Sequence, residues 1–134
     1  KVSAIPYEIP SSLEENLFDS YCYAVSDLSK RVKASAIVVF THKGRTAVRL
    51  SKYRPDARIV AISDCFETMN NLCLKYGVTS IFAEDIKDEQ KAIENARQLV
   101  IQSGHVKKGD VVVITSGAPF SDKSRMNWLK FAVI

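Results

Sequence analysis

Residues 36–46 read AIVVFTHKGRT, in which a five-residue apolar run is followed at once by polar residues and a glycine. The run is rich in β-branched residues, is too short for a helix and is apolar at every position. These properties are typical of a central strand in a parallel sheet. Runs of the same kind occur at residues 59–62, 80–82 and 111–114. The sequence therefore predicts four parallel strands in one sheet.

Helical segments are predicted around these strands. Ser12 and Glu15 form the pattern of a capping box, and the apolar residues that follow lie along one helix face, which predicts a long helix over residues 13–33. Further helices are predicted between the strands, at residues 46–53, 66–76 and 88–103. Strands that alternate with helices predict an α/β fold, in which helices cover both faces of a parallel sheet.

The last apolar run, residues 128–134, has no helix before it and alternates around Lys130. Its short connection from the preceding strand predicts an antiparallel edge strand. An edge that carries Trp128, Phe131 and Ile134 is exposed unless something covers it, so we expect self-association. Residues 1–12 contain two prolines and no periodicity. We interpret them as a lead-in or linker to a single domain over residues 13–134, and the absence of an initial Met favours a fragment.

The composition excludes several classes of protein. The 134 residues are 46% apolar and 25% charged, the balance of a soluble globular domain. No apolar run approaches the roughly 18 residues that cross a bilayer, so no membrane partner is expected. The net charge is +4, without a basic block interleaved with aromatics, so no nucleic-acid partner is expected. The three cysteines lie among apolar residues without metal-ligand spacing, which predicts buried reduced thiols and a cytoplasmic location.

The polar residues 41–46 are typical of an anion-binding loop. They come directly before a predicted helix, whose first amides point outward and favour negative charge. Gly44 would let the backbone approach an anion, and Arg45 offers two parallel donors to a phosphate. The candidate phosphate ligands are Thr41, His42, Lys43, Gly44, Arg45 and Thr46. The alternative is a solvated cationic face, extended by Arg49 and Lys52, with an ordinary threonine cap.

A second candidate loop follows the fourth strand. Its candidate ligands are Ser116, Gly117, Lys123 and Ser124. In open α/β sheets, ligands bind beyond the carboxyl ends of the strands, where the strand order reverses. If the order reverses between the first and fourth strands, both loops face one crevice. The alternative is a polar connection to the edge strand.

No set of residues in the sequence indicates catalysis by this chain. Cys65 follows a strand, as a phosphatase nucleophile does, but no Arg follows closely to hold a phosphate. Asp64 also ends a strand, and we interpret it as a helix cap, because the acidic cluster of a phosphoacceptor domain is missing. The chain has no Ser/His/Asp order, paired carboxylates or metal-ligand cluster. We therefore expect no catalytic residues, no metal ligands and no cofactor in it.

Several segments resemble the C-terminal domain of pyruvate kinase. They are residues 36–47, residues 51–55 (SKYRP) with 59–62, and residues 107–117 (KKGDVVVITSG), which occur in the order and spacing of that family. YRP after a helix and KGD before a valine run are specific in combination. The resemblance covers residues 13–134.

The resemblance implies a three-layer α/β/α fold with a five-stranded mixed sheet of order 3-2-1-4-5, the last strand antiparallel. It implies a glycolytic enzyme in which phosphoryl transfer from phosphoenolpyruvate to ADP, with Mg²⁺ and K⁺, takes place in a separate barrel domain. The domain that this chain resembles has no catalytic residues, binds a phosphorylated allosteric effector and contributes to a homotetramer. Residues 41–46 match its effector loop.

The resemblance also reduces the range of effectors that we expect this chain to bind. Relatives that bind fructose bisphosphate have a glycine-rich loop after the fourth strand, where this chain reads SDKS at residues 121–124. The Trp and Arg that hold the second phosphate in those relatives fall near Asp85 and Ala92. We therefore expect AMP or a sugar monophosphate, or an effector response that has been lost. The alternatives are a free-standing phosphometabolite-binding module and, less favoured, a small independent enzyme that uses Cys65.

Overall fold

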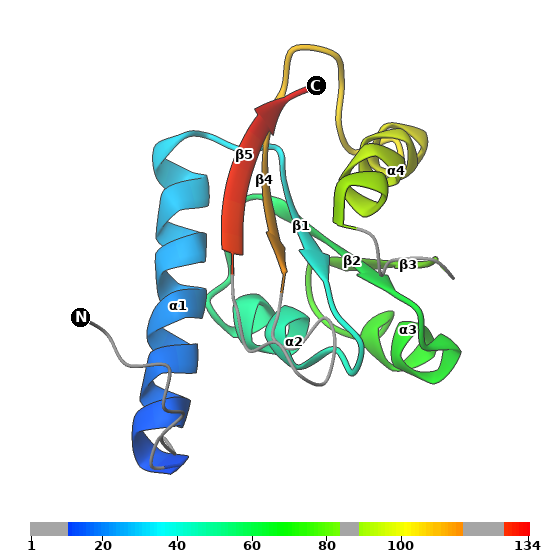
Figure 1. Ribbon diagram of the computed structural model, residues 1–134. Helices are drawn as coiled ribbons and strands as arrows, with labels where there is room; N and C mark the ends of the chain where they lie inside the picture. Colours follow the sequence, from blue (N-terminus) through cyan, green and yellow to red (C-terminus); the bar gives the residue numbers. More distant parts are fainter. Residues whose placement is uncertain (1–10, 84–88, 117–127) are drawn as a thin grey trace, which may run out of the picture.

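The computed structural model describes residues 11–83, 89–116 and 128–134. Five strands form one mixed sheet in the order β3-β2-β1-β4-β5 (Figure 1). The central strand β1 (Ala36–Phe40) pairs in parallel with β2 (Arg58–Ser63) and with β4 (Val111–Ser116). β3 (Val78–Phe82) pairs in parallel with β2, and β5 (Trp128–Val133) pairs antiparallel with β4. The predicted strand order and the antiparallel edge strand are confirmed.

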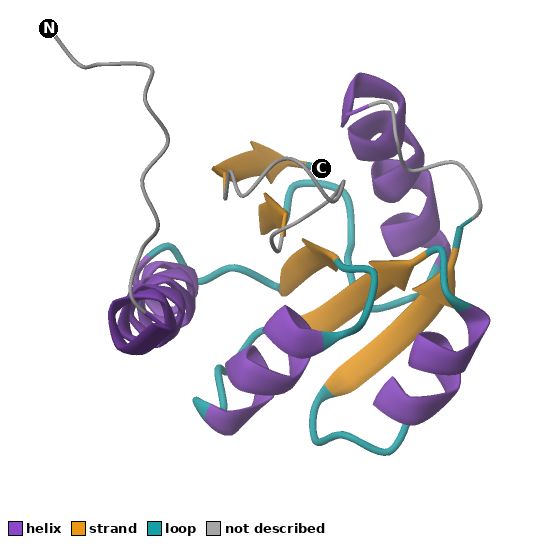
Figure 2. Ribbon diagram, turned by 60° about the horizontal axis from the view of Figure 1, so that its bottom comes forward, coloured by secondary structure: helices purple, strands orange, loops and turns teal. Residues whose placement is uncertain are grey.

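Helices cover both faces of the sheet, which is why every residue of β1 is buried. α1 (Ser11–Arg31), α2 (Arg45–Lys52) and α3 (Phe66–Leu72) contribute to a core on one face, and α4 (Glu89–Gln102) packs on the other. Figure 2 shows α2 and α3 on one side of the strands and α4 on the opposite side. The expected three-layer α/β/α arrangement is therefore confirmed.

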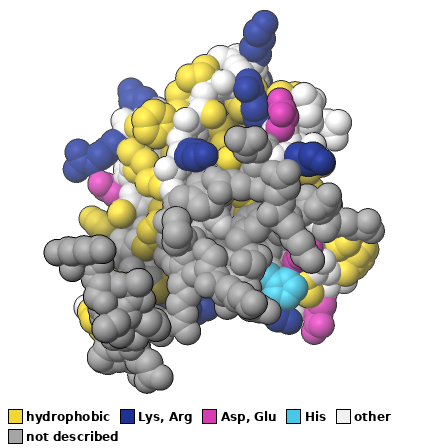
Figure 3. Space-filling view, viewed as in Figure 1, with side chains coloured by type: hydrophobic (Ala, Val, Ile, Leu, Met, Phe, Trp, Pro, Cys, Tyr) yellow, Lys and Arg dark blue, Asp and Glu magenta, His cyan; other side chains and the backbone are white. Residues whose placement is uncertain are grey.

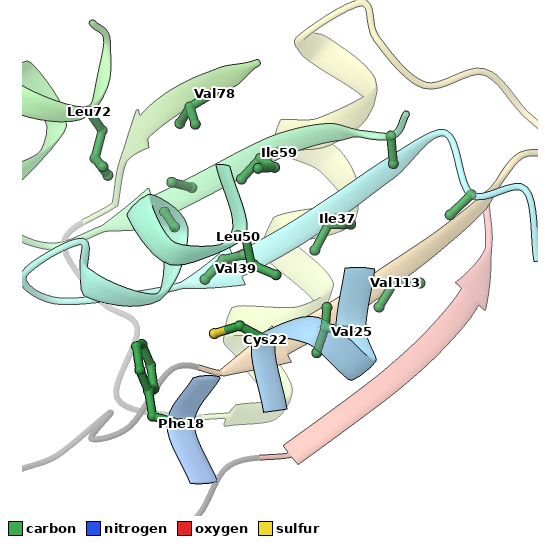
Figure 4. Close-up of a cluster of buried hydrophobic side chains, with 14 residues drawn as sticks. Phe18, Cys22, Val25, Ile37, Val39, Leu50, Ile59, Leu72, Val78 and Val113 are labelled. Atoms are coloured by element: carbon green, nitrogen blue, oxygen red, sulfur yellow. The ribbon is translucent and has the colours of Figure 1, made fainter. Parts of the chain in front are cut away.

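The core between the sheet and α1, α2 and α3 is the larger of the two. Phe18, Cys22 and Val25 extend from α1 toward the strands, and Leu50 extends from α2 (Figure 4). They meet Ile37 and other inward-facing residues of the sheet. The second core is built from alternate residues of the same strands together with Ala96 and Val100 of α4. This division follows from the two-residue period of a strand, which sends successive side chains to opposite faces.

The structure shortens one predicted helix. The sequence predicts a helix over residues 66–76, but α3 ends at Leu72. Lys75 N donates to Leu72 O at 3.0 Å, and Val78 N donates to Lys75 O at 3.3 Å, so the chain turns before β3. The helix ends early because Val78 must pair with Ile59 of β2, and a further helical turn would displace that register.

The prediction for the cysteines is only partly correct. All three are free thiols, and Cys22 is buried in the first core. Cys73 is exposed and Cys65 is partly exposed, so the prediction that all three are buried is wrong. Cys73 follows directly on the end of α3, where the side chains of the turn no longer face the sheet. Burial raises the pKa of the Cys22 thiol to about 12, which keeps it protonated at neutral pH.

The edge strand β5 leaves apolar side chains exposed on the face of the sheet that α1 covers. Phe131 lies opposite Val113 of β4, so it faces the same side of the sheet as α1, and its exposed fraction is 64%. Leu129 and Val133 share that face and are also exposed. In Figure 3, hydrophobic side chains gather over the upper part of α1 and β5. Ile134 instead packs against the second core and is partly buried, so the predicted exposed edge holds for Phe131 and not for Ile134, while the side chain of Trp128 lies outside what the structure describes.

None of the helices in the described ranges combines the length and the apolar character that a membrane span requires.

Candidate functional site

The predicted anion loop lies where β1 ends and α2 begins. The backbone N–H of Thr41 donates to the carbonyl of Ile62 at 2.9 Å, which continues the pairing of β1 with β2 by one residue. Thr41 is buried, and its hydroxyl oxygen accepts a hydrogen bond from Gly44 N at 2.8 Å. The hydroxyl thereby closes residues 41–44 into a tight turn. α2 begins immediately after this turn, with no acidic residue in its first turn and no side-chain cap.

Gly44 is the residue that lets the turn lie against α3. Its φ of +86° falls in the left-handed region, which favours glycine. A Cβ atom added there would lie 3.1 Å from Thr68 Cγ2 and 3.2 Å from Leu72 Cδ2, both side chains of α3. The glycine is therefore required by the turn and by the packing of α3, whether or not an anion binds.

Arg45 and Arg49 point from α2 toward α1. The Arg45 guanidinium forms an ion pair with Glu15 and lies 4.1 Å from the ring centroid of Phe18. Arg49 donates to Glu15 Oε1 at 2.7 Å and to Asp19 Oδ1 at 2.8 Å. These contacts show that the predicted cationic face of α2 lies opposite an acidic face of α1.

Glu15 therefore does not act as a helix-capping residue. The sequence pattern predicted that its carboxylate would return to the start of its own helix. The structure places Ser12 inside α1 and pairs Glu15 with two guanidinium groups on α2. The prediction of a capping box is wrong, because two charged partners compete more strongly for the carboxylate than one backbone amide does.

His42 and Asp64 form a pair at the carboxyl ends of β1 and β2. His42 Nδ1 lies 2.7 Å from Asp64 Oδ1, and both side chains remain partly exposed. The Ser63 hydroxyl donates to the carbonyl of His42 at 3.0 Å and fixes the backbone of the turn from the neighbouring strand. The predicted capping role of Asp64 is wrong: the residue before α3 is Cys65, and its N–H donates to the Ser63 hydroxyl at 3.0 Å.

Two more members of the candidate loop differ sharply in exposure. Lys43 is exposed beside this pair, whereas Thr46 is buried. The charge of Lys43 acts on the neighbouring Cys65. Hydrogen bonds from the Thr68 hydroxyl and from backbone amides of α3, together with the Lys43 charge, hold the pKa of the Cys65 thiol below its usual value. The positive charge of Lys43 is therefore felt by the thiol at the start of α3.

The start of the second candidate loop lies beside the first. Ser116 ends β4, is buried, and lies opposite Phe40, the residue that precedes Thr41. The strand order reverses between β1 and β4, as the sequence argument required. Gly117, Lys123 and Ser124 lie outside the described residues, as does Asp85. Ser116 is therefore the one predicted ligand of this loop whose position next to the first loop is known.

Comparison with models of protein families identifies the family of this chain. The family model for the pyruvate kinase alpha/beta domain matches residues 19–132. The chain belongs to this family. It is 30% identical over 122 residues to a pyruvate kinase of Staphylococcus haemolyticus, with 91% of this chain and 21% of that protein covered. It is 33% identical over 113 residues to a pyruvate kinase of Clostridium acetobutylicum, with 84% of this chain and 23% of that protein covered.

The solved structures agree at the level of the fold. A pyruvate kinase of Cryptosporidium parvum in complex with ADP superposes with a TM-score of 0.78 and 23% sequence identity. The match covers 96% of this chain and 25% of that one. This chain thus spans about a fifth to a quarter of the length of the pyruvate kinases that it matches, and it corresponds to their C-terminal alpha/beta domain.

The acidic partners on α1 of this pyruvate kinase domain were not predicted from the sequence. Glu15 and Asp19 are four residues apart on α1, and Arg45 and Arg49 are four residues apart on α2. The matching spacing of opposite charges was a signal, because residues four apart share one helix face. It could not be used without knowing that α1 packs against α2.

Asp19 has a second partner in the same domain. Hydrogen bonds from Tyr53 and Arg49 hold the pKa of the Asp19 carboxyl below its usual value. The Asp19 side chain is therefore charged at neutral pH, and its contact with Arg49 connects α1 to the middle of α2. Across the described ranges, no group of three or more His, Cys, Asp and Glu side chains is arranged to hold a metal ion.

Proposed function

We propose that this chain is a regulatory and assembly domain of a pyruvate kinase, and that it binds a phosphorylated effector at residues 41–46. The observation that carries the proposal is the position of this loop. It lies at the carboxyl end of the central strand and at the point where strand order reverses, directly before the N-terminus of α2. The exposed cation of Lys43 and the imidazole of His42 lie in the same turn.

In this proposal, phosphoryl transfer takes place in the rest of the enzyme and not in this chain. The chain acts together with a catalytic barrel domain, in which phosphoenolpyruvate and ADP react with the help of Mg²⁺ and K⁺ in the cytoplasm. We expect no phosphoryl transfer by the 134-residue chain alone. The lead-in of residues 1–12 would then connect the domain over residues 13–134 to the barrel.

The effector is expected to be a monophosphate. AMP, ribose 5-phosphate and fructose 1,6-bisphosphate are titrated into the chain by calorimetry. We expect one of the two monophosphates to bind with a dissociation constant below about 1 mM, which corresponds to roughly −4 kcal/mol. Removal of the exposed Lys43 side chain in Lys43→Ala should weaken monophosphate binding about three- to tenfold, as expected for the loss of one hydrogen bond worth about 1 kcal/mol.

Arg58→Ala is the matched control for this titration. Arg58 is an exposed cation at the start of β2, which is the opposite end of the sheet, and its loss changes the net charge by the same amount. We expect its affinity for the monophosphate to equal that of the unmodified chain. Absence of heat with all three compounds at concentrations well above 1 mM would contradict the proposed function.

The assembly part of the proposal rests on β5. Among the described residues no strand pairs with its outer edge, and Phe131 lies exposed on the face that α1 shares. An unpaired edge with apolar side chains favours pairing with another copy, and we propose that the full enzyme is a homotetramer. In analytical ultracentrifugation we expect the chain to self-associate, and Phe131→Glu to weaken association at least about tenfold.

The control for assembly is Leu74→Glu, which introduces the same charge at a side chain that is 87% exposed after α3. Its association should be unchanged. A monomeric mass at every concentration, or equal weakening by both substitutions, would count against assembly through β5.

A further inference from the structure

The charged contacts between α1 and α2 form two groups that differ in how exposed their side chains are. In the first group, Arg45 pairs with Glu15, and the two side chains are 55% and 50% exposed. In the second group, the Arg49 side chain is 26% exposed and contacts Glu15 and Asp19. Tyr53 also helps to hold the pKa of Asp19 below its usual value. We call the first group, the Arg45–Glu15 pair, the clasp.

The clasp is weak enough to open. An ion pair between side chains that are about half exposed contributes little to stability, because water solvates both partners and salt screens them. Opening it gives up the contact between the Arg45 guanidinium and the Phe18 ring, but it leaves Arg49 in place between α1 and α2 and over the same ring. The Arg45 guanidinium can therefore leave Glu15 without separating the two helices.

Arg45 is a member of the anion loop, residues 41–46, and it is also the first residue of α2. Its guanidinium can form its paired hydrogen bonds with one carboxylate or with one phosphate, and an effector phosphate held beside Glu15 would be repelled by that carboxylate. The same side chain thus has two anionic partners that exclude each other. One partner is a residue of α1, and the other is the effector.

On this basis, and provided that the proposed effector site exists, we propose that the Arg45–Glu15 clasp is an autoinhibitory contact. Glu15 holds the Arg45 guanidinium, and effector binding at residues 41–46 transfers this guanidinium from Glu15 to the phosphate. Binding at residues 41–46 is thereby coupled to the first turns of α1. By thermodynamic reciprocity, a condition that loosens Glu15 from Arg45 increases the affinity for the effector.

The test measures sulfate binding to the 134-residue chain at about 0.15 M ionic strength by amide chemical shifts in NMR titrations. Sulfate stays dianionic throughout the neutral pH range. It resembles a phosphate group without the sugar or base of a metabolite, so its binding reports on the anion site alone. We expect Glu15→Gln to raise the affinity roughly two- to fivefold, which corresponds to the release of one exposed ion pair. In an Arg45→Ala background the same substitution should have no effect.

Asp19→Asn is the matched control, because it removes the same charge one turn further along α1 without touching Arg45. Its sulfate affinity should remain close to that of the unmodified chain. A second readout does not depend on this series: sulfate should shift the amide signals around Glu15 in the unmodified chain, and this shift should be lost in Arg45→Ala.

The outcomes separate the two proposals. If sulfate binds at the loop but Glu15→Gln leaves its affinity unchanged or lowers it, the clasp is not autoinhibitory and the proposed function stands. An equal gain in Asp19→Asn overturns the clasp as well, because the effect is then one of net charge. If no variant binds sulfate or the monophosphates, the proposed effector function fails and the clasp fails with it.

Discussion

Replacing Leu50 by Ala is expected to lower the free energy of unfolding by about 2–5 kcal/mol, out of a total of roughly 5–15 kcal/mol for a domain of this size. Leu50 is fully buried and extends from α2 into the larger core, toward Ile37 and Val39 of β1 (Figure 4). Its truncation removes apolar contacts and leaves a cavity, since β1 is held between two other strands and cannot move to fill it. Chemical denaturation followed by circular dichroism measures the loss.

Leu74→Ala deletes the same atoms from a side chain that is almost fully solvent-exposed, and its unfolding free energy should stay within about 0.5 kcal/mol of the unmodified value. If Leu50→Ala costs no more than this control, the orientation of α2 on the sheet is incorrect. The position of the effector loop would then be incorrect too, because the loop leads directly into α2.

Gly44→Ala is expected to be the second most damaging substitution, with a loss of about 1–3 kcal/mol. A left-handed backbone conformation is unfavourable for alanine, and the new methyl group would come within 3.1 Å of Thr68 and 3.2 Å of Leu72. Either α3 moves away or the turn changes shape. Both outcomes displace the amides at the start of α2, so binding of a monophosphate should weaken along with stability.

Gly104→Ala separates the cost of the left-handed backbone conformation from the cost of crowding against α3. Gly104 has a φ of +80°, but no atom lies within 4 Å of the position that its Cβ would take. It therefore reports the cost of the backbone conformation alone, and the excess loss in Gly44→Ala measures the crowding against α3. Equal losses in the two variants, measured by the same denaturation, would show that α3 does not press on the loop.

The strands were the most predictable part of this fold. An apolar run of five residues such as 36–40, rich in β-branched residues, can be buried on both faces only in the interior of a sheet, so its burial follows from the pattern. The end of α3 was less predictable. Residues 73–76 continue the composition of a helix, and only the pairing of Val78 with Ile59 ends it at Leu72.

The candidate site shows the same division. The residue types of loop 41–46 and its place after the first strand were apparent from the chain alone. The partners of its charged side chains were not: Arg45 turns to Glu15, and Asp64 pairs with His42 instead of capping α3. Each of these pairs joins residues more than 20 positions apart, and local spacing carries no information on contacts of that range.

Periodicity and turn residues along the chain were thus sufficient to establish the strand count, the covering of the sheet by helices and the loop at the end of β1. They were sufficient because the two-residue and 3.6-residue periods arise from the backbone itself. The direction in which Arg45, Arg49 and His42 point was decided by the packing of α1 and α3 against the ends of the strands. A side chain takes the partner that the folded neighbours bring within reach, and those neighbours are set by the whole arrangement of the sheet and helices.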